Sequence, residues 1–189
     1  MPKPLSLAVF IAKGLIAFWL AYQVINYLSD AYQVSHYKSY IPTSLEVKKN
    51  IVVRSRRGGF IEGCGVAIFQ LSESTSGKIE TEGLNYLNRH LVPRKDQKLL
   101  TRAEGQYLKL YRKWLKTPFS SEDNNGYPLF RKLANRDLGG RVCVDVPGEL
   151  KANILSAIDD ASSYYTKIEK HNELIVIPKL SLAIFSHDR

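Results

Sequence analysis

Cysteine, histidine and paired carboxylates are the residue types in this chain that could carry out catalysis. Cys64 lies in the glycine-rich run Gly58–Gly65, where missing side chains would let a ligand approach the backbone. Its thiol could act as a nucleophile if the fold brought a histidine close to it. However, the glycines lack the order of a dinucleotide fingerprint, and they precede a strand-like run instead of a helix. We therefore expect a hairpin with a glycine bulge here, and Cys64 is the one catalytic candidate.

The remaining candidates for chemistry match no known spacing. The four histidines are far apart in the sequence, so we predict no metal site and no cofactor. Asp159 and Asp160 are adjacent and are expected on the wet side of a helix. The only other cysteine is Cys143. Cys64 and Cys143 would form one bridge in an oxidising compartment, or stay two small buried thiols in a reducing one.

Basic residues are concentrated in the segment from Arg89 to Lys116, within a chain of net charge +9. Residues 101–116 have apolar side chains at helical spacing and predict a helix with one basic face. A surplus of this size favours anionic partners over neutral ones, while a solvated helix face is the simpler alternative. The predicted anion- or partner-binding residues are Arg94, Lys95, Lys98, Arg102, Lys109, Arg112, Lys113 and Lys116.

The run Leu5–Leu28 is almost entirely apolar and contains a single charge, Lys13. As a helix it would be about 36 Å long, enough to cross a hydrocarbon core of about 30 Å. We interpret it as an uncleaved signal anchor. The alternatives are a signal peptide cleaved after Ala31 and a buried core helix. The flanking positive charges favour a globular domain outside the cytoplasm.

Small residues recur within this run at helical spacing. Gly14, Ala17 and Ala21 would lie on one face of the helix, beside Lys13. Small side chains let two helices approach closely in a membrane, and a charge inside a span is often functional. We therefore predict a transmembrane contact through Lys13, Gly14, Ala17 and Ala21, with snorkelling of Lys13 to the headgroups as the alternative.

The remaining pattern predicts an α+β fold. We expect one N-terminal transmembrane helix and then a small domain with a mostly antiparallel sheet of four or five strands and three or four helices. Residues 1–40 would form the anchor and its exit, and residues 41–189 a single globular domain. The expected strands are 49–54, 60–71, 141–146, 174–177 and 180–185, and the expected helices are 72–91, 101–116, 129–134 and 147–170.

No stretch of the chain resembles a family that we can identify from its residues. The pattern is more typical of an interaction protein than of an enzyme: a subunit of a membrane complex, or an exclusion or immunity-type factor. We expect it in the inner membrane, with another membrane or envelope protein as partner and no nucleic acid. The alternatives are a membrane-tethered enzyme using Cys64, and a domain that docks on anionic lipid or polymer.

Overall fold

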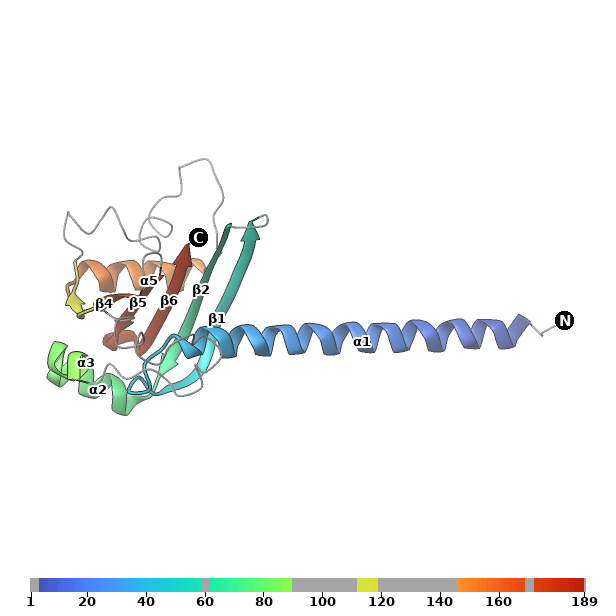
Figure 1. Ribbon diagram of the computed structural model, residues 1–189, viewed down its shortest axis with the longest axis horizontal. Helices are drawn as coiled ribbons and strands as arrows, with labels where there is room; N and C mark the ends of the chain where they lie inside the picture. The colour runs from blue at the N-terminus through green and yellow to red at the C-terminus, as the bar shows by residue number, and fades with distance from the viewer. Residues whose placement is uncertain (1–3, 59–61, 90–111, 119–145, 169–171, 189) are drawn as a thin grey trace, which may run out of the picture. The chain divides into compact units, whose positions relative to one another are not determined.

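The computed structural model describes residues 4–58, 62–89, 112–118, 146–168 and 172–188. The chain divides into two compact units, Met1–His36 and Tyr37–Arg189. The second unit holds a six-stranded sheet in which every pairing is antiparallel (Figure 1). The predicted α+β class is confirmed, with one strand more than the upper expected number.

The strands are ordered β1-β2-β6-β5-β4-β3 across the sheet. Their bounds are β1 Val47–Gly58, β2 Glu62–Leu71, β3 Leu115–Lys116, β4 Tyr164–Ile168, β5 Asn172–Ile177 and β6 Leu182–Asp188. The helices are α1 Pro4–Ser39, α2 Glu73–Glu82, α3 Leu84–Arg89 and α5 Gly148–Asp159, with a short 3-10 turn, η4, at Pro178–Leu180. The last strand in sequence, β6, is thus internal, between β2 and β5.

Helix α5 covers one face of the sheet (Figure 1). Side chains alternate between faces along a strand, so residues two apart share a face. Ile184 and Leu182 on β6 therefore pack with Ile175 on β5 and with Ile158 on α5, all almost fully buried. The whole aliphatic cluster on this side, which we call the α5 face, comprises Val66, Ile68, Val146, Ile154, Ala157, Ile158, Tyr165, Ile175, Ile177, Leu182 and Ile184.

The predicted hairpin between the first two strands is confirmed, because β1 pairs with β2 in antiparallel fashion. The glycine bulge is not where it was expected. The register is regular through Ser55↔Gly65 and Arg57↔Gly63, and it shifts between Val47 and Lys49 and between Asn50 and Val52. The irregularities thus lie in the amino-terminal half of β1.

The single helix predicted over residues 72–91 is wrong, because the chain breaks at Gly83. Ser72 caps α2, with its side chain accepting a hydrogen bond from the amide of Thr75 at 3.1 Å. Gly83 has φ +56°, which favours glycine, and its amide donates to the carbonyl of Ile79. A second short helix, α3, follows it.

The helix predicted over residues 147–170 is also too long. α5 ends at Asp159, Ala161 has a positive φ of 51°, and residues from Tyr164 onward form β4. The Oγ of Ser163 donates to the carbonyl of Ala157 at 2.8 Å, which satisfies one of the free carbonyls at the helix end. The aromatic and β-branched residues of β4 then favour a strand, although their spacing also fits a helix.

Residues 112–116 are extended, so the helix predicted to end at Lys116 is wrong over this part. Leu115 and Lys116 form β3, which pairs with β4. The predicted split of the last two strands at Pro178 is confirmed, since η4 separates β5 from β6. The predicted strand 141–146 lies outside the described residues except for its last position, and the predicted helical piece 129–134 lies wholly outside them.

Candidate functional site

Helix α1 carries large apolar side chains on all of its faces. Every side chain from Phe10 to Tyr32 is exposed, and those of Phe10 and Trp19 expose more than half of their surface. By length and composition, Phe10–Ser39 is the one helix among the described residues that could cross a membrane, and a signal sequence near an N-terminus would meet the same criterion. Such a surface is costly in water and favourable in lipid.

The residues predicted to form a transmembrane contact all lie on this helix. Gly14, Ala17 and Ala21 are three and four positions apart and share one face, with Lys13 beside it. All four are exposed, and a Cβ placed on Gly14 would meet open space. The small-residue face therefore exists as geometry, and its use in a contact stays a prediction.

The last turn of α1 belongs to the globular unit and packs on the sheet through aromatic rings. The Oη of Tyr37 is hydrogen-bonded to Nε2 of His187 at 3.0 Å. Tyr40 stacks on Phe185 with ring centroids 4.6 Å apart, and Tyr37 lies 5.7 Å from the same ring. We call Tyr37, Tyr40, Gly65, Phe185 and His187 the exit cluster. It holds the carboxyl-terminal end of α1 and the residue that follows it, Tyr40, against β2 and β6.

Gly65 on β2 leaves the space that the exit cluster needs. A Cβ at this position would stand 2.6 Å from Nε2 of His187 and would also overlap the hydroxyl of Tyr37. No ordinary side chain fits there while the hydrogen bond is kept. The glycine expected in a turn or bulge thus has a packing role, which no local sequence signal indicates.

The segment after the exit cluster is buried as well. Ile41 and Leu45 expose almost nothing, and the hydroxyl of Tyr86 on α3 donates to the carbonyl of Ser44 at 3.0 Å. Burial raises the pKa of Tyr86 above its usual value, and the nearby carboxylates of Glu82 and Glu46 raise it further. The chain is therefore fixed to the globular unit directly after the candidate span.

Cys64 on β2 is buried and disulfide-bonded. The chain has one other cysteine, Cys143, which lies outside the described residues. The sequence left two alternatives open, a disulfide bridge or two buried thiols. In the structure Cys64 is part of a disulfide. In that form the sulfur has no thiol to act as a nucleophile, so the described geometry gives no support to a catalytic role.

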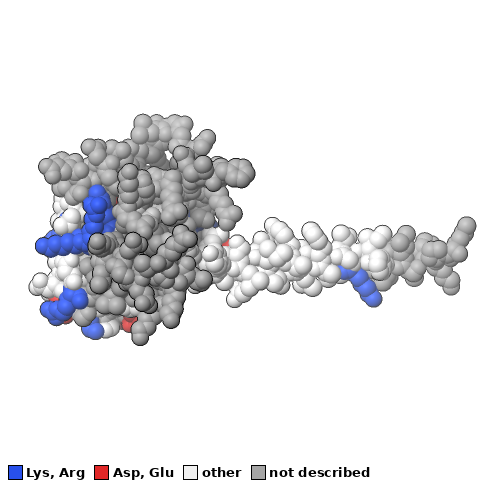
Figure 2. Space-filling model, viewed as in Figure 1, with Lys and Arg blue, Asp and Glu red and all other residues white. Residues whose placement is uncertain are grey.

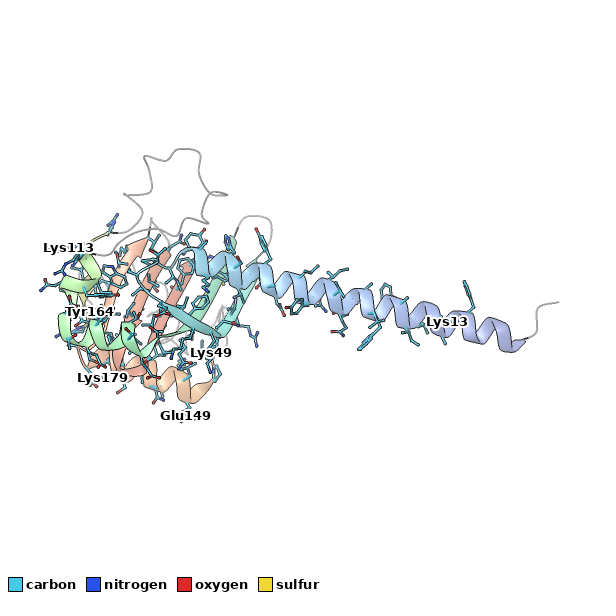
Figure 3. All side chains as sticks on the ribbon, turned by 90° about the horizontal axis from the view of Figure 1, so that it is seen from below. Lys13, Lys49, Lys113, Glu149, Tyr164 and Lys179 are labelled. Carbon is cyan, nitrogen blue, oxygen red and sulfur yellow. The ribbon has the colours of Figure 1, made fainter. Side chains whose placement is uncertain are left out.

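Among the predicted basic residues, Arg112, Lys113 and Lys116 are described and exposed. They flank Trp114, which is buried and whose amide donates to Oδ1 of Asn88 at 2.9 Å. None of the three cations has an ion pair with a residue in the described ranges. Lys113 projects away from the sheet (Figure 3), and several described Lys and Arg side chains are visible at the surface of the globular unit (Figure 2). The predicted residues Arg94, Lys95, Lys98, Arg102 and Lys109 lie outside the described residues.

The buried polar pair of Glu173 and Ser186 was not predicted from the sequence. Glu173 on β5 is almost fully buried, and its Oε1 accepts a hydrogen bond of 2.6 Å from the Oγ of Ser186 on β6. The two residues are directly opposite in the register, on the α5 face. A lone glutamate at the start of the apolar run ELIVI was the available signal, because carboxylates are rarely buried without a partner.

The described residues contain no group of three His, Cys, Asp or Glu side chains that could hold a metal ion. What the described geometry offers is a candidate span, an aromatic cluster that fixes its exit, and exposed basic side chains. Comparison with family models, curated proteins and solved structures found no match to this chain.

Proposed function

We propose that this chain is a single-pass, membrane-anchored interaction or accessory protein, either a subunit of a membrane complex or an exclusion or immunity-type factor. The observation that supports it is the contrast between α1, whose apolar side chains are exposed, and a globular unit with its own buried core. A helix of this kind is stable when lipid or another helix covers it. The exit cluster would then hold the domain close to the membrane surface.

We place the globular domain on the oxidising side of the inner membrane. Disulfides persist outside the cytoplasm and are rare within it, and Cys64 is disulfide-bonded. The positive charge of Lys3, before the span, favours the same topology. Blocking free thiols before and after reduction in intact cells would test this placement. A Cys64 thiol that is alkylated without a reductant would contradict it.

Co-purification in mild detergent tests the proposed function. The full-length chain is expected to retain a membrane or envelope protein in a fixed ratio. The double substitution Ala17→Leu and Ala21→Leu should weaken that association if the small-residue face is used, because leucine prevents close approach of two helices. Ala12→Leu is the matched control, because Ala12 is an exposed position on the opposite side of the same helix. A chain that purifies alone under every mild condition would contradict the proposal.

A second candidate is docking on anionic lipid, which the exposed cations Arg112, Lys113 and Lys116 favour. Each Lys or Arg near a charged bilayer adds about 1 kcal/mol of attraction. Flotation with vesicles of increasing phosphatidylserine content separates this candidate from the first one. Binding that does not depend on the anionic fraction would dispose of it.

A further inference from the structure

Strand β1 forms one edge of the sheet and is unusually long. It spans 12 residues, Val47–Gly58, whereas strands of about 5 to 6 residues are typical. In the order of the described strands it pairs with β2 alone. Lys49, Asn50, Ile51 and Arg54 are exposed, and Lys49 projects away from β1 (Figure 3). An edge of this kind presents backbone donors and acceptors that a further strand could pair with.

The two halves of this edge differ in regularity. Both register shifts lie before Val52, and from Val52 to Gly58 each residue pairs with successive residues of β2 without interruption. Bulges twist an edge away from a flat partner and so prevent pairing. Only the amino-terminal half of β1 has this protection. The carboxyl-terminal half pairs without interruption over seven residues, Val52–Gly58.

All formal charges on β1 are positive. The strand contains Lys48, Lys49, Arg54, Arg56 and Arg57 and no acidic residue. Lys48 has an ion pair of 3.6 Å with Glu73. In the described ranges Lys49 and Arg54 have no ion pair, and the Arg54 guanidinium only reaches the neighbouring Val53 carbonyl at 3.4 Å. Of the described cations on β1, Lys49 and Arg54 therefore have no compensating carboxylate in the described ranges.

The positive charge of β1 favours some partners for this edge over others. Like charges directly opposite each other destabilise a strand pair, so a second copy of β1 would bring two basic rows together. Opposite charges across a strand pair stabilise it. A lipid headgroup would neutralise the cations but would leave the backbone groups of the edge unpaired. An extended acidic segment satisfies both the charges and the backbone.

We infer that β1 binds an extended, acidic segment of a partner protein by strand addition at Val52–Gly58. The inference rests on the proposed function, because it names the chemistry of the partner for an interaction protein. Backbone hydrogen bonds would provide the pairing, and the exposed Arg54 would favour an acidic side chain on the added strand. The partner would differ from one bound through the small-residue face of α1.

Peptide binding to the full-length chain in detergent micelles tests the inference. The probe is a fluorescent nine-residue peptide of alternating glutamate and valine, and binding is followed by anisotropy. The reference probes are a lysine-valine peptide, polyglutamate, and the acidic peptide methylated on alternate backbone nitrogens along one edge. The protein variants are Arg54→Glu and, as a control, Lys179→Glu, since Lys179 is an exposed residue on η4, away from β1.

The acidic peptide is expected to bind, and Arg54→Glu should weaken it about fivefold to tenfold, while Lys179→Glu leaves it unchanged. Backbone methylation should abolish binding, because it removes the donors and blocks close pairing. Equal binding of the methylated peptide or of polyglutamate would overturn the inference in favour of general charge attraction. Absence of peptide binding, or Arg54-dependent binding to phosphatidylserine vesicles alone, would overturn it as well.

Failure here is distinguishable from failure of the proposed function. If a stoichiometric partner co-purifies with the unmodified chain but the acidic peptide does not bind to it, the interaction role holds and the β1 site is wrong. If no partner co-purifies with the unmodified chain, yet the acidic peptide binds β1 as described, the strand-addition site holds and the accessory role fails.

Discussion

The two faces of the sheet are covered by different chemistry. On the α5 face, aliphatic side chains such as Ile184 pack against the helix, beside the buried polar pair of Glu173 and Ser186. On the opposite face the exit cluster adds aromatic rings, with Tyr37 and His187 hydrogen-bonded across 150 positions of sequence. Adjacent residues of one strand, Ile184 and Phe185, thus belong to two kinds of core.

The two faces are expected to respond differently to amino-acid substitutions. An aliphatic cluster depends on filled volume, so its losses are cavities. The exit cluster depends on the fit between a glycine, a phenol and an imidazole, so its losses are steric overlap and unpaired polar atoms. The second kind of packing also fixes the residues that follow the candidate span. Substitutions that remove volume on the α5 face and add volume in the exit cluster can therefore distinguish the two kinds of packing.

The largest effect is expected from Ile184→Ala on the α5 face. Ile184 is completely buried, and removal of its side chain should lower the free energy of unfolding by about 2 to 5 kcal/mol. Ile184→Val should cost only about 0.5 to 1.5 kcal/mol. Chemical unfolding of the full-length chain in micelles, followed by circular dichroism, gives both numbers. Equal costs for the two variants would mean that volume does not govern this face.

Gly65→Ala tests the opposite face by adding volume. The new methyl group would overlap the Tyr37 hydroxyl and the His187 ring, so we expect a loss of about 1 to 3 kcal/mol. Gly77→Ala is the matched control, because a Cβ there meets open space in a helix. That control should be neutral or stabilising by up to about 1 kcal/mol. If both glycine variants behave alike, the exit cluster is not tightly packed.

Tyr37→Phe removes one hydroxyl from the exit cluster and should cost about 0.5 to 1.5 kcal/mol. The ring stays, so its contact with Phe185 is expected to persist. The variant also removes one of the atoms that a Cβ at Gly65 would meet. Gly65→Ala should therefore cost less in the Tyr37→Phe background than in the unmodified chain, as a double-mutant cycle would measure. Additive costs would show that the two residues do not interact.

The smallest effect is expected at alkaline pH from Tyr86. Its folded-state pKa is raised by burial and then by Glu82 and Glu46, so the unfolded chain loses the phenolic proton first. Stability from this group is therefore complete below the usual tyrosine pKa of about 10 and is lost as pH rises through the higher folded-state pKa. Tyr86→Phe should flatten the fall in stability above that pH. An unchanged slope would exclude Tyr86 as a contributor.

Local patterns predicted the elements whose cause is local. The apolar run gave the candidate span, the glycines gave the β1–β2 hairpin, and Pro178 gave the break between β5 and β6. The α5 helix was found, but its end was not, since the residues of β4 continue the helical spacing of apolar side chains.

The exit cluster and the extended segment around Trp114 could not be predicted in this way. Tyr37 and His187 are at opposite ends of the chain, and nothing near either residue indicates the other. The apolar spacing of residues 101–116 also fits a helix, and tertiary packing overrides it at least from Arg112 to Lys116, where the chain pairs with β4. For the predicted basic site, the sequence indicates which residues are charged but not where their side chains lie in the fold.

The internal place of β6 has a consequence for biosynthesis. β6 joins β2 on one side to β5 on the other, and it is made after both of them. During translation the chain therefore holds two unjoined pieces, the β1–β2 hairpin and the strands β3 to β5, until Leu182–Asp188 has left the ribosome. His187 arrives among these last residues, so the exit cluster also closes last. If α1 spans a membrane as proposed, it would leave the ribosome well before the domain can fold.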